Sequence, residues 1–250
     1  MPGKMSQVGS QWPSLTSWHL SSAAIWLTII GTVVLWYFSR RTTPRGLLAW
    51  AAALALSIAL LSSDVQATAM VSYRSHMIEH LVTILMIAPL VATGTNVRMS
   101  RGSATLGLIA FTVLVPLYHL TRLGALVMEQ TGGHVIELLS FIVVGVWFWL
   151  PVYGVDRPMT DVQRLTYTFI ALPVVVTTGL VLWSSDARAI SSVGMDMPMM
   201  SIGDIHSGGL VMIQWGSALM GAHIVGLIFS SVLQRRRTFL PVGYNYVDTQ

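Results

Sequence analysis

Residues 76–95 read HMIEHLVTILMIAPLVATGT, a run with no lysine or arginine and only one acidic residue, Glu79. A transmembrane α-helix needs about 20 mainly apolar residues, because each residue advances the helix by about 1.5 Å and the hydrocarbon core is about 30 Å thick. This run has that length and that composition. We therefore expect residues 76–95 to cross a lipid bilayer as one helix.

Six further stretches have a similar length and composition. They are roughly residues 20–39, 46–63, 103–122, 134–153, 163–183 and 207–233. Charged residues make up 10% of the whole chain, whereas a water-soluble domain carries about 25%. The sequence therefore predicts an all-α, polytopic integral membrane protein. We expect a bundle of seven transmembrane helices over residues 20–237, a short outer segment before it (1–19) and a cytoplasmic tail after it (238–250).

Most arginines gather on one side of these spans. That side holds Arg40, Arg41, Arg45, Arg98, Arg101, Arg157, Arg164, Arg235, Arg236 and Arg237. The other side holds only Lys4, Arg74, Arg122 and Arg188. Because basic residues are retained in cytoplasmic loops, we expect the larger set to face the cytoplasm. The resulting orientation is N-out and C-in, as an odd number of spans requires.

The residue types that are missing exclude several kinds of chemistry. The chain has no cysteine, so disulfides, thiolate metal sites and cysteine nucleophiles are excluded. Lys4 is the only lysine, and no predicted span can therefore form the Schiff base of a retinal protein. We find no serine–histidine–acid pattern, phosphate-binding loop or nucleic-acid-binding patch. We therefore expect neither an enzyme nor a nucleic-acid partner.

The histidines fall mainly at one end of the predicted spans. In the orientation given above, the outer end holds His19, His76, His80, His119, His134 and His206, which are six of the seven. Only His223 lies deep in a span, toward the cytoplasm. A single histidine is common at a membrane interface, where its ring contacts apolar groups and its nitrogens reach water. Six on one side indicate a shared functional site.

Two spans begin with related histidine–glutamate patterns. His76 and His80 are four residues apart, which places both imidazoles on one face of a helix, about 6 Å apart along its axis. This spacing is typical of metal ligands. The span that starts at His134 repeats part of the pattern with Glu137, three residues later. We expect Glu79 and Glu137 to orient the histidines through hydrogen bonds rather than to bind a metal directly.

Methionines crowd the predicted outer loop before the last span. Met195, Met197, Met199 and Met200 lie close together, and Asp204 and His206 follow them. Thioether sulfur and imidazole suit Cu(I), whereas hard cations would need more carboxylates. The loop therefore predicts copper binding with a preference for Cu(I), and Asp204 is grouped with the orienting carboxylates. The alternative is a flexible loop whose methionines dip into the membrane interface.

Several of these stretches resemble one protein family. The run YRSHMIEH (residues 73–80), followed by Ala-Pro-Leu at residues 88–90 and by Gly94, resembles the central motif of the polytopic CtaG-type cytochrome c oxidase assembly factors. The span from His134 to a tryptophan–proline corner at residues 147–151 is also similar. Two further similar stretches follow in the same order. They are residues 156–167 and the opening of the last span at residues 204–212.

The resemblance implies a non-enzymatic assembly factor of the bacterial cytoplasmic (inner) membrane. Such a protein would bind or pass copper at its outer face for maturation of a cytochrome c oxidase. Its partners would be oxidase subunits or a copper chaperone, besides membrane lipid. The first-choice ligands are His76, His80 and His134. The expected outer relay consists of His119 and His206 with Met195, Met197, Met199 and Met200.

Two departures from the family pattern and three alternatives accompany this interpretation. Leu138 stands where the family commonly carries a second histidine, and His206 stands where glutamine is expected. One alternative is a redox protein with b-type haem held between His80 and either His134 or His119. A second is a copper transporter, which would need ligands that continue through the membrane. A third is a carboxylate-bridged two-metal site, which would need more glutamates than these spans supply.

Overall fold

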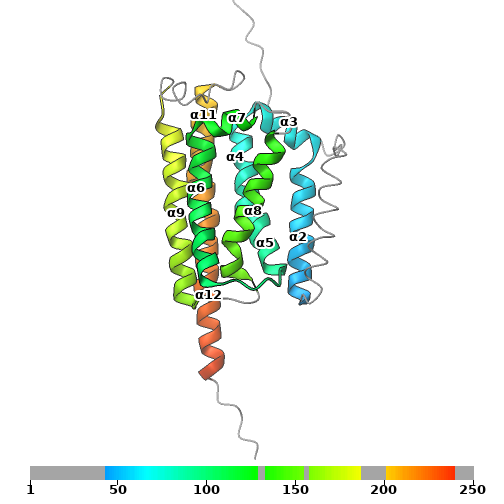
Figure 1. The fold of residues 1–250 in the computed structure, drawn as a ribbon, viewed down its shortest axis with the longest axis vertical. Helices are drawn as coiled ribbons and strands as arrows, with labels where there is room; N and C mark the ends of the chain where they lie inside the picture. Colours follow the sequence, from blue (N-terminus) through cyan, green and yellow to red (C-terminus); the bar gives the residue numbers. More distant parts are fainter. Residues whose placement is uncertain (1–42, 129–132, 155–157, 187–200, 240–250) are drawn as a thin grey trace, which may run out of the picture.

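The computed structural model describes residues 43–128, 133–154, 158–186 and 201–239, and each regular element in these ranges is a helix. The elements are α2 (Pro44–Leu60), α3 (Ser63–Val71), α4 (Tyr73–Val82), η1 (Thr83–Ile87), α5 (Ala88–Gly94), α6 (Arg101–Leu120), α7 (Arg122–Met128), α8 (Gly133–Tyr153), α9 (Asp161–Ser184), α11 (Ile202–Val211), η2 (Met212–Gly216) and α12 (Ser217–Phe239). The π-helical turns η1 and η2 continue the helices on either side of them. The long helices run side by side, and the short helices α3 and α7 lie at one end (Figure 1).

Five predicted spans are confirmed as helices that are long and apolar enough to cross a membrane. They are Tyr73–Gly94, Arg101–Leu120, Gly133–Tyr153, Asp161–Ser184 and Ile202–Leu233. The predicted span 46–63 corresponds to α2, a shorter apolar helix of 17 residues. The predicted span 20–39 and the outer segment 1–19 lie outside the described residues. The count of seven helices and the N-out, C-in orientation therefore stay predictions.

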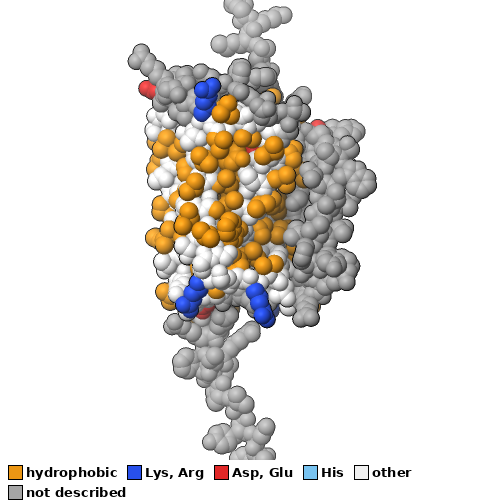
Figure 2. Space-filling view, viewed as in Figure 1, with side chains coloured by type: hydrophobic (Ala, Val, Ile, Leu, Met, Phe, Trp, Pro, Cys, Tyr) orange, Lys and Arg blue, Asp and Glu red, His pale blue; other side chains and the backbone are white. Residues whose placement is uncertain are grey.

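Large apolar side chains cover the outside of the bundle. Val143, Phe169, Val225 and Phe229 expose 62–65% of their surface. Figure 2 shows apolar side chains across the middle of one face, with basic side chains near its two ends. An apolar surface of this extent is unfavourable in water and is what the hydrocarbon core of a bilayer accommodates. The described part of the chain is therefore built as a membrane protein.

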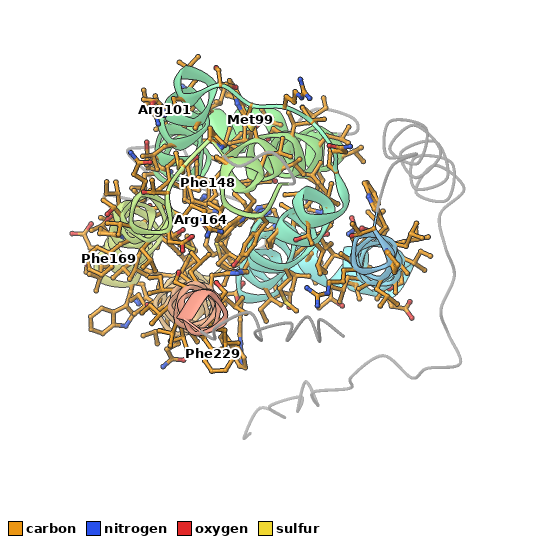
Figure 3. The ribbon with its side chains drawn as sticks, turned by 90° about the horizontal axis from the view of Figure 1, so that it is seen from below. Met99, Arg101, Phe148, Arg164, Phe169 and Phe229 are labelled. Atoms are coloured by element: carbon orange, nitrogen blue, oxygen red, sulfur yellow. The ribbon has the colours of Figure 1, made fainter. Side chains whose placement is uncertain are left out.

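Aromatic rings fill the middle of the bundle. The ring of Phe148 in α8 stacks on Phe111 of α6, with centroids 4.3 Å apart, and on Tyr167 of α9, with centroids 4.9 Å apart. Figure 3 shows Phe148 inside the bundle, whereas Phe169 and Phe229 point outward. In lipid, helices are held together by van der Waals packing of this kind, because there is no hydrophobic effect between them.

A proline accounts for the π-helical turn η1. Pro89 has no backbone N–H, so it leaves the carbonyl of Leu85 without its usual helical partner. One residue earlier, the N–H of Ala88 bonds to the carbonyl of Thr83. This longer bond leaves the carbonyl of Ile84 free as well. Two adjacent carbonyls in the interior therefore need donors from elsewhere, since an unpaired polar group in lipid costs several kcal/mol.

Side chains from two other helices bind these carbonyls. Trp149 Nε1 donates to the carbonyl of Ile84 at 2.7 Å, and His223 Nε2 donates to the carbonyl of Leu85 at 2.8 Å. The Tyr153 hydroxyl lies 2.7 Å from Nδ1 of His223 and donates to it, because the neutral ring carries its proton on Nε2. Both nitrogens of His223 are thus occupied. His223 fixes α12 against η1 and has no nitrogen left for a ligand.

Glycines bring α11 close to its neighbours. A Cβ atom on Gly209 would lie 2.6 Å from the backbone nitrogen of Trp183 and 2.7 Å from the carbonyl oxygen of Gly179, both in α9. A Cβ atom on Gly208 would likewise overlap the ring of Tyr73 in α4. Small residues at such contacts allow helix backbones to approach each other in membranes. Helix α11 is therefore held against both α4 and α9.

Replacement of Gly209 by alanine should destabilise the protein by about 1–3 kcal/mol, because the new methyl group overlaps backbone atoms that cannot rotate away. Thermal unfolding of the purified protein in detergent measures this loss. Gly221→Ala and Gly226→Ala are matched controls in α12, where a Cβ would meet nothing within 4 Å. Equal unfolding temperatures for the Gly209 variant and these controls would contradict the close contact of α11 with α9.

Candidate metal centre

Helices α4 and α8 bring their histidine–glutamate patterns face to face. Helix α4 carries His76, Glu79 and His80, and helix α8 carries His134 and Glu137. Spacings of three and four residues place these side chains on one face of each helix. All five are buried, and the two glutamates expose only 1% and 2% of their surface. The predicted first-choice ligands His76, His80 and His134 therefore lie in one cluster.

The start of α4 is fixed by capping interactions. The hydroxyl of Ser72 accepts a hydrogen bond from the N–H of Ser75 at 3.4 Å. Asp204 of α11 accepts one hydrogen bond from the N–H of Tyr73 and another, at 3.2 Å, from the Ser72 hydroxyl. A carboxylate at a helix N-terminus stabilises the helix through its free N–H groups and its dipole. Asp204 therefore supports the cluster through the backbone of α4.

One set of donor atoms joins His76, His80 and Glu137. The Nε2 atoms of His76 and His80 lie 2.9 Å apart. The two carboxylate oxygens of Glu137 lie 3.4 Å from Nε2 of His76 and 3.3 Å from Nε2 of His80. Ligand atoms bound to one ion at about 2.0–2.1 Å are separated by about 2.8–3.4 Å when the angles between them are about 90–110°. These three side chains have the spacing of ligands to a single ion.

A second set joins Glu79 and His134 to the same centre. Nε2 of His134 lies 2.9 Å from Oε2 of Glu79, and Nδ1 of His134 lies 3.7 Å from Oε2 of Glu137. The other oxygen of Glu79 accepts a hydrogen bond from the amide of Gln66. His76, Glu79 and His134 each offer an atom close enough to the others to hold an ion. His76 belongs to both sets, so the five side chains form one continuous cluster.

Histidines surround the carboxyl groups of the two glutamates. In the part of the chain that the structure describes, the ion pairs within 4.0 Å of Glu79 and Glu137 all involve His76, His80 or His134. A buried carboxylate is costly unless a positive charge compensates it. Neutral imidazoles cannot do so. Protonation of a histidine, protonation of a carboxyl group or a bound metal cation would each remove this imbalance.

Several atoms of the cluster lack a well-directed hydrogen bond. Within the described residues these include Nδ1 of His76 and of His80, both nitrogens of His134, and Oε2 of each glutamate. For His134 and Glu79 the separation of 2.9 Å permits an electrostatic contact, although its direction does not suit a hydrogen bond. A buried polar group left unpaired costs about 1–3 kcal/mol. An ion bound among these atoms would remove part of that cost.

His119 reaches the cluster from α6. Its Nδ1 donates to the carbonyl of Val115 at 2.6 Å, and its ring centroid lies 5.3 Å from that of His80. The side chain exposes 3% of its surface. The structure thus brings together four of the predicted histidines, His76, His80, His119 and His134.

The other predicted site residues lie elsewhere or outside the described residues. Nε2 of His206 donates to the carbonyl of Ser185 at 2.8 Å and links α11 to the end of α9. Leu138, at the position where the family commonly has histidine, is buried in α8 and offers no donor atom. Met195, Met197, Met199 and Met200 lie outside the described residues, as does His19. The predicted methionine site therefore stays a prediction.

The packing of the rings bears on the haem alternative. The ring of His80 stacks on Phe141 with centroids 4.4 Å apart, and its centroid lies 4.2 Å from that of His76. The ring of His76 lies 5.3 Å from that of His134. The ring of His80 also lies 5.3 Å from that of His119, so rings in such close contact leave no space for a porphyrin between His80 and either His119 or His134. This arrangement favours an ion held directly by side chains.

Two features of the site were not expected from the sequence. Glu137 contacts His76 and His80 of the neighbouring helix α4 as well as His134 of its own helix, and the spacing within α8 predicts only the last of these contacts. Gln66 of α3, which donates to Glu79 and to the carbonyl of Leu60, carries no motif that would single it out. Both features depend on how separate helices pack, and a single-helix pattern does not contain that information.

Comparison with known families identifies the chain. The model of the cytochrome c oxidase caa3 assembly factor family (Caa3_CtaG) matches residues 29–234. This range includes α3, α4, α6 and α8, which carry the cluster. No curated protein and no solved structure matches the chain. The family match covers most of the sequence and confirms what the motifs indicated: the chain belongs to the cytochrome c oxidase caa3 assembly factor family.

Proposed function

We propose that this assembly factor binds copper as its cargo at the cluster between α4 and α8. His76, His80 and Glu137 would hold the ion, and His134 and Glu79 would complete its surroundings. The observation that carries this proposal is the meeting of two buried carboxylates with histidine nitrogens at ligand spacing. A divalent cation would neutralise both carboxylates without protonation of any histidine.

The choice of copper rests on donor chemistry and on the role of the family. Imidazole nitrogen binds zinc, copper, iron and nickel, and among divalent ions of the first transition row Cu(II) binds such sites most tightly. The resemblance to CtaG-type factors implies copper insertion into an oxidase. The preference for Cu(I) rests on Met195, Met197, Met199 and Met200, and it is a separate proposal for that loop. Holding and passing copper requires no catalysis by the protein.

The position of the cluster suits exchange with a partner. Helices α4 and α8 both begin at the end of the bundle where α3 and α7 lie (Figure 1). Gln66 of α3 contacts Glu79 directly, so the cluster lies next to a helix at that end of the bundle. In the predicted orientation this is the extracytoplasmic end. A copper chaperone or an oxidase subunit would reach the cluster from there.

Glu137→Gln should weaken Cu(II) binding by about 10-fold or more, because it removes one of the two charges that compensate the ion and one of its ligand atoms. His76→Ala and His80→Ala should have effects at least as large. Competition with a chelator of known affinity, on full-length protein in detergent, measures the change. His223→Gln is the matched control, because both nitrogens of His223 are already hydrogen-bonded.

If the parent protein takes up no copper, or if the cluster variants bind it as tightly as the His223→Gln protein does, the cluster is not a copper site. The five side chains would then form a network of protonated histidines and carboxylates that only stabilises the packing of α4 against α8. In that case Glu137→Gln would lower the unfolding temperature and change nothing else.

In cells that depend on this factor, Glu137→Gln should reduce the activity of the cytochrome c oxidase and its copper content, while the level of the factor in the membrane stays unchanged. The reason is that the variant folds but delivers less cargo. Oxidase activity, copper analysis of the purified oxidase and immunodetection of the factor check this together. Full oxidase activity with the Glu137→Gln variant would contradict the proposed delivery role.

A further inference from the structure

The five side chains of the cluster do not converge on one point. Within the described residues, the ligand atoms that lie within 4.8 Å of one another form two sets of three. The first set is His76, His80 and Glu137, and the second set is His76, Glu79 and His134. Atoms bound to one ion at about 2.0–2.1 Å lie at most about 4.2 Å apart. In this arrangement a single ion can therefore bind one set or the other, but not all five side chains at once.

Two atoms of the second set are placed as ligands of one ion would be. Nε2 of His134 and Oε2 of Glu79 lie 2.9 Å apart, but neither has a well-directed hydrogen bond within the described residues. Two ligands of one ion have this relation, because their lone pairs point toward the ion and not toward each other. The other oxygen of Glu79 accepts a hydrogen bond from Gln66. Glu79 therefore offers Oε2 to an ion that His134 also binds.

The second set lies nearer the end of the bundle where α3 and α7 lie. Helices α4 and α8 both begin at that end (Figure 1). His134 is the second residue of α8, whereas Glu137 lies almost one turn farther along the helix. His134 also exposes 9% of its surface, compared with 3% for His80 and 2% for Glu137. An ion that arrives from that end therefore meets His134 before it meets His80 or Glu137.

The charge of the cluster limits it to one divalent ion at a time. Glu79 and Glu137 together carry two negative charges when both are ionised, and one divalent ion compensates them. A second divalent ion would bring two further positive charges into a buried site, where an uncompensated charge is strongly unfavourable. The two sets are therefore suited to bind one ion in turn, rather than two ions together.

We propose that the cluster contains two successive positions for one copper ion. The second set, His76, Glu79 and His134, is the entry position, and the first set, His76, His80 and Glu137, is the holding position. Because His76 belongs to both, the ion remains bound to this side chain while its other ligands change. The step exchanges ligands only and needs no change of oxidation state. This inference rests on the proposed function, that copper is the cargo of the cluster, and adds the route by which the cargo enters and leaves.

Electron paramagnetic resonance of bound Cu(II) distinguishes the two positions, because the spectrum reports how many nitrogen atoms bind the ion. The experiment uses the full-length protein in detergent with one equivalent of Cu(II). We expect couplings from two nitrogens in the parent, those of His76 and His80, and two again in the His134→Gln protein. His80→Ala removes a ligand of the holding position, and the ion should then stay at the entry position, again with two nitrogens, now those of His76 and His134.

The double variant carries the decisive comparison. In the His80→Ala protein, the further change His134→Gln should reduce the couplings to one nitrogen and weaken Cu(II) binding by about 10-fold or more, because it removes a ligand of the entry position. His223→Gln is the matched control, since both nitrogens of His223 are already hydrogen-bonded. Added to His80→Ala, it should change neither the spectrum nor the affinity.

The rate of Cu(II) uptake tests the order of the two positions. After rapid mixing, His134→Gln should slow uptake by a larger factor than His80→Ala does, because only the first change affects the position that the ion meets first. Uptake that His80→Ala slows as much as His134→Gln does would overturn this order.

Three results would overturn the inference while the proposed function stands. They are a single nitrogen in the His80→Ala protein, a spectrum of that protein that does not respond to His134→Gln, and a signal from two coupled Cu(II) ions when the parent receives two equivalents. If His80→Ala does not fold, His80→Gln takes its place with the same expectations. The proposed function fails differently: the parent then takes up no Cu(II), or Glu137→Gln binds it as tightly as the parent, and both proposals fall.

Discussion

The structure depends above all on the compensation of two negative charges buried in the membrane. Glu79 and Glu137 are almost fully buried, and within the described residues their ion-pair partners are histidines of α4 and α8. In a medium of low dielectric constant an uncompensated carboxylate would be protonated or would destabilise the fold. The facing histidines, together with the cation that we propose binds between them, would resolve this, so that one arrangement serves both the fold and the proposed site.

Contacts elsewhere in the fold keep α4 and α8 in the positions that bring these glutamates and histidines together. Asp204 ties the start of α4 to α11, and the glycines of α11 let that helix lie close to both α4 and α9. Farther along the same span, Pro89 releases two carbonyls that Trp149 and His223 bind from α8 and α12. Each of these contacts joins different helices. Together they oppose rotation of any one helix and so hold the side chains of the cluster in place.

The sequence predicted the parts of this site that depend on a single helix. Apolar runs and the low content of charged residues indicated a membrane protein, and the spacing of His76 and His80 correctly placed both rings on one face. The direct approach of Glu137 to those two histidines was not predictable, because it depends on the rotation and depth of α8 relative to α4. The contacts of Trp149 and His223 were unpredictable for the same reason. The sequence shows Pro89, but it does not show which distant side chains bind the carbonyls that this proline leaves free. The methionine loop and the first predicted span lie outside the described residues and stay predictions.

Anomalous X-ray diffraction from crystals of the copper-loaded protein, recorded on both sides of the copper absorption edge, tests the central claim most directly. We predict an anomalous peak between α4 and α8, within bonding distance of Nε2 of His76, Nε2 of His80 and the carboxylate of Glu137. Copper peaks only at other places, with the histidines and glutamates of the cluster in direct hydrogen bonds to one another, would contradict the account.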